Sequence, residues 1–253
     1  MAKDAHQRSV VEHHFPKMVT TAGGAPRIKD NPPLIFHARE RSHEELMLHV
    51  RNAFADYRES LPEHLKLVLD RFRLVDHAMK VVGVGSVGTF CAVLLLMASE
   101  EDSLFLQVKQ AGPSVLEAYA GKSAHANHGQ RVVFGSKIMQ AASDLFLGWT
   151  VGQQRPYFYL RQLRDMKIAV PVEAFMPGDM FRYARLCGWT LARAHARSGE
   201  PAVISGYLGN SDRFDQAVAD FSIAYADQSE RDHETLVKAV KAGKVKATIQ
   251  RAS

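Results

Sequence analysis

A glycine-rich stretch between two strongly apolar segments constrains this chain more than any other feature of its sequence. The stretch KVVGVGSVGTFCAVLLLMASEEDSLFLQVKQA spans residues 80–111, and Gly83, Gly85 and Gly88 follow the spacing G-x-G-x-x-G. Glycine has no Cβ and tolerates positive φ, so the backbone N–H groups of such a turn can approach phosphate oxygens. The pattern therefore indicates nucleotide binding, and the elements after Gly88 decide which kind of site it would form.

The composition indicates a folded protein of the cytoplasm. The chain has 253 residues, and 46% of them are hydrophobic, which is enough for a substantial core. Its 32 basic and 27 acidic residues are mixed along the chain, whereas a nucleic-acid partner calls for a concentrated basic face. Cys91 and Cys187 lie in separate apolar segments and are typical of core residues in a reducing compartment. The polar N-terminus and the short apolar run 90–98 indicate neither a signal peptide nor a membrane partner.

The pattern of apolar residues and breakers predicts an α+β fold with a mainly antiparallel sheet of about five strands. We expect four regions: an arm with two helices at 1–78, a glycine-loop sheet at 79–165, a helical part at 166–243 and a basic tail at 244–253. Helices are predicted at 42–57, 60–75, 114–119, 130–143 and 179–197, from 212 onward and from 229 to 243. Strands are predicted at 79–84, 89–97, 104–110, 145–151 and 157–163.

One hypothesis for the glycines is the dinucleotide-binding turn. It requires a strand, the glycine turn and then a helix, here residues 89–98, followed by a strand that ends in an acid. Gln107, Val108 and Lys109 stand where that acid is needed. No alternation of parallel strands and helices follows in the later sequence.

The second hypothesis is the kinase-type arrangement, with the glycines and Ser86 in the turn of a β-hairpin. The third strand then carries a lysine for the phosphates, here Lys109, and a following helix supplies an acid that orients it. Glu117 is the nearest helical acid, and the helix at 130–143 has no carboxylate. A third interpretation is purely structural: the glycines form a tight turn, and Lys109 ends a strand. These alternatives stay open from the pattern alone.

Metal-binding spacing is lacking in the sequence. Eight of the twelve histidines precede Val81, but they are not joined to acids or cysteines at ligand spacing, so we expect no metal site. We also assign no catalytic residue to this chain.

Several consecutive blocks resemble a bacterial family, the domain of unknown function 2252, over about residues 31–243. They are KVVGVGSVGT, LFLQVKQAGPSVLE, GQRVVFGSKIMQAASDLFLGWT, YLRQLRDMK, YARLCGWTLARAHARSG and YADQSERDH. Members of that family usually carry, upstream, segments like GDxHxxNFG and DxNDFDE, which resemble the catalytic loop and metal-binding acids of aminoglycoside and choline kinase-like phosphotransferases. No such segment occurs between Met1 and Ser253.

The resemblance implies a kinase-like small lobe followed by a helical lobe. It implies a nucleotide-binding remnant or truncated part of a phosphotransferase, inactive alone, that takes ATP and Mg²⁺ as ligands. The residues that would contact the nucleotide are Gly83, Gly85, Ser86, Gly88, Lys109 and Glu117. The alternative function is a non-enzymatic interaction or assembly module that binds a protein partner or a second copy of itself.

Overall fold

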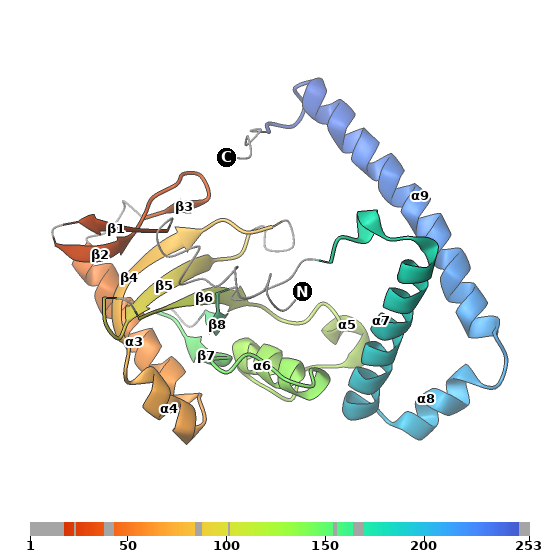
Figure 1. The fold of residues 1–253 in the computed structure, drawn as a ribbon, viewed down its shortest axis with the longest axis horizontal. Helices are drawn as coiled ribbons and strands as arrows, with labels where there is room; N and C mark the ends of the chain where they lie inside the picture. Colours follow the sequence, from red (N-terminus) through yellow and green to blue (C-terminus); the bar gives the residue numbers. More distant parts are fainter. Residues whose placement is uncertain are drawn as a thin grey trace. The chain divides into compact units, whose positions relative to one another are not determined.

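A six-stranded antiparallel sheet forms the centre of the first of two units, which comprise residues 1–198 and 199–253. The computed structural model describes residues 18–22, 24–37, 43–83, 88–100, 102–153, 156–163 and 170–247. The sheet has the strand order β3-β4-β5-β6-β8-β7, and all neighbouring strands are antiparallel (Figure 1). The α+β class is thus confirmed.

The strands come from four separated stretches of the sequence. They are β3 (Ile35–Phe36), β4 (Arg73–Lys80), β5 (Cys91–Met97), β6 (Ser103–Ala111), β7 (Gly148–Val151) and β8 (Tyr157–Gln162). A separate hairpin of β1 (Val19–Ala22) and β2 (Ala25–Ile28) precedes them, and we call residues 18–37 the arm. All seven residues of β5 are apolar and buried, because the sheet is covered on both faces at this strand.

The first unit has five α-helices in its described residues; α3, α4 and α6 pack on the sheet, and α7 packs on α6. They are α3 (His43–Glu59), α4 (Glu63–Leu69), α5 (Glu117–Ala120), α6 (His128–Met139) and α7 (Pro177–Ser198), with a 3₁₀ turn at Val172–Ala174. Helix α6 begins at a side-chain cap, since Asn127 Oδ1 accepts a hydrogen bond of 3.1 Å from the Gln130 N–H.

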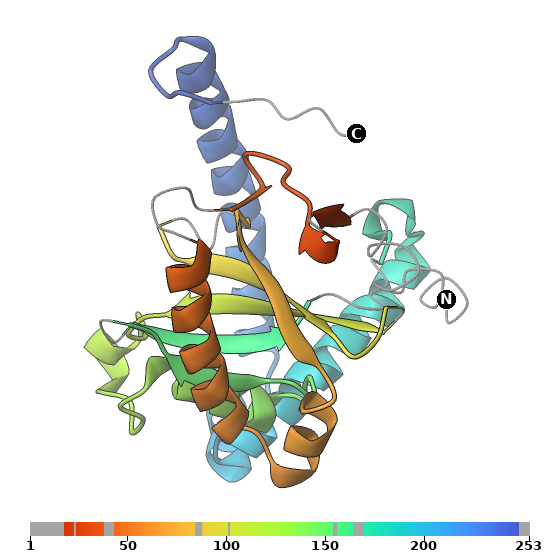
Figure 2. The same cartoon turned by 90° about the vertical axis from the view of Figure 1, so that its left-hand side faces the viewer.

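One face of the sheet, which we call the α3 face, is covered by α3 and α4 (Figure 2). Its core contains Leu94, Leu96, Leu106 and Leu160, packed with Tyr57 of α3. The Tyr57 hydroxyl is buried and donates a hydrogen bond of 2.6 Å to the Phe146 carbonyl. Burial accordingly raises the pKa of Tyr57 well above its ordinary value.

The sheet ends at β7, and the segment around the end of α3 is bonded to this edge. The Trp149 N–H donates a hydrogen bond of 2.9 Å to Ser60 Oγ, and Thr150 Oγ1 donates one of 2.6 Å to the Ala53 carbonyl. Gly148 permits this approach, because a Cβ at that position would lie 2.5 Å from Ser60 Oγ. These contacts hold α3 against a strand about 90 residues later in the sequence.

The opposite face, which we call the arm face, is covered by the arm and by α6. Ile28 of the arm packs in a buried cluster with Val93, Leu95 and Phe105. Over the other half of this face, the α6 residues Phe134 and His128 contact aromatic rings of β7 and β8, with centroid distances of 5.7 and 5.2 Å. The sheet is therefore buried on both sides by the arm and by helices that lie between its strands in the sequence.

The second unit contains α8 (Pro201–Leu208) and α9 (Arg213–Lys241). A single helix of 29 residues replaces the two helices predicted here, so the expected cap at Ser229 is wrong, because Ser229 lies inside α9. Within the described ranges, none of the helices is long and apolar enough to cross a membrane.

The boundaries of two other elements differ from the sequence-based expectation. Helix α4 ends at Leu69, and the chain enters β4 at Arg73, whereas the sequence predicts a helix through Val75 and a strand from Met79. Phe72 and Val75 are three residues apart, which fits the inward face of a helix, but Val75 belongs to a strand held by β5. The strands predicted at 89–97, 104–110 and 157–163 are confirmed with shifts of one or two residues.

Candidate functional site

The glycines lie in the link between two neighbouring antiparallel strands. Residues 81–90, which we call the glycine connection, join β4 to β5. Gly83 and Gly88 belong to its described part, and Gly88 has a φ of +77°, which a residue with a side chain rarely adopts. Gly85 and Ser86 lie outside the described residues. The dinucleotide hypothesis is wrong, because the segment that must form its helix is the strand β5.

Lys109 lies on β6, the third strand of the meander, as the kinase-type hypothesis predicts. In the register of the sheet it stands opposite Cys91 of β5 and opposite Tyr159 of β8. Alternate residues of a strand share a face, so Lys109 is on the same face as Gln107 and Phe105, which is the arm face. Cys91 is the third residue after Gly88, so Lys109 lies beside the point where the chain leaves the glycine connection.

Two further cations are near Lys109, and we call Lys80, Lys109 and Arg161 the basic cluster. All three exert an electrostatic effect on the Cys91 thiol. Burial raises the pKa of Cys91, and the positive charges of Lys109, Lys80 and Arg161 oppose that rise because they favour the thiolate. The cluster therefore gathers cationic side chains from β4, β6 and β8 at one end of the arm face.

Gln107 holds the guanidinium group of Arg161 in place. Arg161 donates hydrogen bonds from Nε and from one terminal nitrogen to Gln107 Oε1, at 3.2 and 3.1 Å. The Gln107 amide nitrogen in turn donates to Cys91 Sγ at 3.5 Å. Gln107 is buried, so this chain of contacts holds Arg161 against the sheet.

A polar pocket of about 580 Å³ adjoins the cluster between α6 and the sheet. Arg161 and Tyr159 line it from β8, and Ser136 lines it from α6. Burial raises the pKa of Tyr159, and the charge of Arg161 opposes that rise. The pocket thus combines a cation, a phenol and a hydroxyl with the carboxylate of Asp144, whose oxygens accept hydrogen bonds from the N–H groups of Phe146 and Gln162.

Glu117, the predicted partner of the lysine, is the first residue of α5. Its Oε1 accepts a hydrogen bond of 3.3 Å from the Ser114 N–H, a contact within its own turn. Helix α6 packs on the arm face but has no carboxylate in its sequence, as the pattern indicated.

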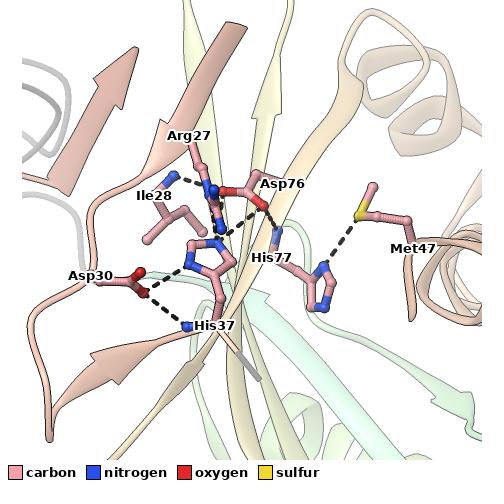
Figure 3. A network of polar contacts seen from close by, with 7 residues as sticks. All are labelled: Arg27, Ile28, Asp30, His37, Met47, Asp76 and His77. Carbon is pink, nitrogen blue, oxygen red and sulfur yellow. Dashed lines mark hydrogen bonds and ion pairs between the residues drawn. The ribbon is translucent and has the colours of Figure 1, made fainter. Parts of the chain in front are cut away.

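The arm is joined to the sheet by a buried network that the sequence did not reveal (Figure 3). Asp76 of β4 accepts hydrogen bonds from the Ile28 N–H at 2.7 Å and from His37 Nε2 at 3.1 Å. The other ring nitrogen of His37 donates to Asp30 at 2.8 Å. Asp76 is 2% exposed, so these bonds satisfy a carboxylate in the core.

Hydrogen bonds, burial and nearby charges shift the pKa values of His37 and Asp76 in this network. The hydrogen bond to Asp76 raises the pKa of His37, while burial opposes that rise and Asp30 adds to it. Burial alone would raise the pKa of Asp76, but hydrogen bonds from His37 and the Ile28 N–H bring it below its ordinary value. The His37 ring has a carboxylate on each side, whereas the nearby charge of Arg27 opposes its protonation. The ring ties Asp30 in the arm to β4, the strand that ends at Lys80.

Metal ligands do not come together in the parts of the chain that the structure describes, where no three His, Cys, Asp or Glu residues are placed to hold an ion.

Comparison with known families gives a match to one that is described as an uncharacterized protein conserved in bacteria, DUF2252. The match covers residues 1–239, so it includes the arm, the sheet and most of α9. Curated proteins and solved structures gave no match. Because the matched region is nearly the whole chain, the protein belongs to the bacterial family DUF2252.

Proposed function

We propose that this protein binds the phosphate groups of a nucleotide, with ATP as the expected ligand, between the glycine connection and the basic cluster. The observation that carries the proposal is the position of Lys109. It lies on the third strand of a meander whose first two strands are joined by the glycine connection. This is the placement of the phosphate-binding lysine in kinase-type sites.

The order of the following elements supports the same arrangement. After the lysine strand, a kinase-type small lobe continues with a helix on the sheet and then a further strand pair. Here α6 follows β6 and contacts the arm face, and β7 and β8 follow α6. Strand β8 pairs directly with β6, so Arg161 comes from the strand beside Lys109.

The charges of the cluster suit a phosphate chain. Arg161 presents a planar fork of donors, and Lys80 and Lys109 are compact point charges. Burial of Cys91 and Gln107 between them lowers the local dielectric, so an anion placed there is attracted more strongly than in water. Backbone N–H groups of the glycine connection would add donors without added charge.

The proposal covers the binding of ATP and does not include phosphoryl transfer, which requires further residues. A transfer site requires carboxylates that hold Mg²⁺ next to the phosphates. The family resemblance associates such acids with segments like GDxHxxNFG and DxNDFDE, which residues 1–253 do not contain. We infer that this chain alone binds ATP without hydrolysing it. Mg²⁺ would then accompany the nucleotide and have no ligand set of its own.

Calorimetric titration with ATP and Mg²⁺ tests the proposal on the full chain. We expect saturable binding by the wild type and a loss of about tenfold or more in Lys109→Ala, because a hydrogen bond to a charged group is worth about 1.5–3 kcal/mol. Arg161→Ala should weaken binding by a similar factor.

Lys137→Ala is the matched control, because Lys137 is exposed on α6. Circular dichroism confirms that each variant is folded. Equal affinity for ATP in wild type and Lys109→Ala, or no saturation in either, would rule the site out.

A second candidate function is self-association through α9. Phe214, Val218, Phe221 and Tyr225 recur at helical spacing along this helix and are exposed within the second unit. We propose that a second copy of the chain covers this stripe. Light scattering should then give a dimer for the wild type and a monomer for Phe221→Asp; a monomeric wild type at micromolar concentration contradicts it.

A further inference from the structure

A pocket of about 290 Å³ lies on the α3 face, which is the side of the sheet opposite to the basic cluster. Apolar side chains of α3 and of the sheet line most of it: Val50, Ala53, Phe54, Leu94, Val108 and Leu160. Phe90 and Phe158 form another wall, with ring centroids 5.5 Å apart in an edge-to-face contact. The surroundings therefore favour a ligand that is itself largely apolar and flat.

The volume of the pocket limits the size of that ligand. An apolar cavity of about 150 Å³ takes one benzene ring. This pocket has about twice that volume, which is room for two fused six-membered rings. A nucleotide phosphate chain would find no lysine or arginine among the described residues that line it.

His49 supplies a polar group to the pocket wall. Its Nδ1 is shielded from solvent and has no hydrogen-bond partner within the described part of the chain. The neighbouring Thr150 hydroxyl is already bonded to the Ala53 carbonyl, and His77 Nδ1 contacts Met47 Sδ at 3.2 Å. Because His49 Nδ1 has almost no accessible surface, a ligand in the pocket does not reach this atom, and apolar contacts would carry its recognition.

We propose that this pocket is a binding site for a bicyclic aromatic compound, with its rings between α3 and the sheet and against the Phe90 and Phe158 wall.

This site is separate from the proposed nucleotide site. Ala92 and Val108 face the pocket, whereas their chain neighbours Cys91 and Lys109 face the opposite side of the sheet. Occupation of the pocket does not require the basic cluster. Failure of one site is thus independent of failure of the other.

Calorimetric titration of the full chain with 2-naphthol tests the proposal. We expect saturable binding with one site in the wild type, and binding at least about tenfold weaker in Ala53→Leu, because the added side chain occupies the pocket. Ala55→Leu is the matched control, since Ala55 is exposed on the same helix, and it should bind like the wild type.

Lys109→Ala should bind 2-naphthol like the wild type, whatever it does to ATP. Absence of saturable binding, or equal affinity in wild type and Ala53→Leu, would overturn the proposal.

Discussion

The two faces of the central sheet use the same strands but differ in how they are covered and in their charge. The α3 face packs against the two helices between β3 and β4, and its core is apolar apart from groups such as the Tyr57 hydroxyl. The arm face has an apolar cluster and the buried Asp76–His37 pair under the arm, and it carries the basic cluster at one end. Alternate residues of β5 and β6 serve the two faces, so one strand pair can support both a core and a charged site.

The largest expected effect compares neighbouring leucines of β5. Leu95 and Leu96 are both fully buried, Leu95 toward the arm face and Leu96 toward the α3 face. We expect Leu95→Ala and Leu96→Ala each to lower the free energy of unfolding by about 2–5 kcal/mol. Chemical denaturation measures both. A cost below about 1 kcal/mol for Leu95→Ala alone would mean that the arm does not cover its face in solution.

A smaller effect concerns the packing of α6 on the arm face. A Cβ at Gly129 would lie 2.1 Å from the Phe158 carbonyl oxygen, a backbone atom that cannot swing away, whereas a Cβ at Gly135 would meet nothing within 4 Å. Gly129→Ala should therefore cost about 1–3 kcal/mol through overpacking. Gly135→Ala on the same helix should gain up to about 1 kcal/mol. Thermal unfolding of the pair separates the two cases, and equal melting temperatures would refute the close contact.

On the α3 face, Tyr57→Phe removes one hydroxyl and keeps the ring. The lost hydrogen bond to the Phe146 carbonyl should lower the free energy of unfolding by about 0.5–1.5 kcal/mol. Urea denaturation detects this change. Tyr119→Phe on α5 is the control, because Tyr119 is exposed, and its unfolding midpoint should not move. If both variants match the wild type, the buried hydroxyl does not stabilise α3 on the sheet.

The smallest effect concerns pH and the arm. Because the pKa of His37 is raised in the folded chain, its contribution to stability is complete below the ordinary value of 6.5 and is lost as the pH rises through the folded pKa. The pKa of Asp76 is lowered, so its contribution is present above 3.8 and is lost as the pH falls through the folded pKa. The network should therefore stabilise the arm most between these two values.

His37→Gln tests this pH dependence. The difference in unfolding free energy between wild type and variant should shrink as the pH rises from about 6 to about 9, the direction that linkage requires. A difference that stays constant over this range would show that folding does not shift the pKa of His37.

The central strands could be predicted because each is a long run of apolar residues between clear turns, as β5 is between a glycine and a polar segment. The strands of the arm could not, because each has two to four residues and depends on distant contacts. The Ile28 N–H, for example, is bonded to Asp76, 48 residues later. The start of β4 was missed because the spacing of Phe72 and Val75 also fits a helix.

Part of the site could be predicted in the same way. The position of Lys109 follows from the order of elements along the chain, since it lies on β6, the second strand after the glycine connection. The positions of Lys80 and Arg161 beside Lys109 could not be predicted, because only the register of β4, β5, β6 and β8 brings them to the same end of the arm face. The pairing of Asp76 with His37 likewise depends on how the arm folds back on β4.

The hydroxyl of Ser60 also bears on aggregation between copies of the protein. Strand β7 is an edge of the sheet, and an edge with unpaired N–H groups can add a strand from another chain and start aggregation. Ser60 occupies the Trp149 N–H, and β7 has only four residues. A neighbouring molecule therefore finds little free backbone to pair with there, and the edge is protected by the same contact that positions α3.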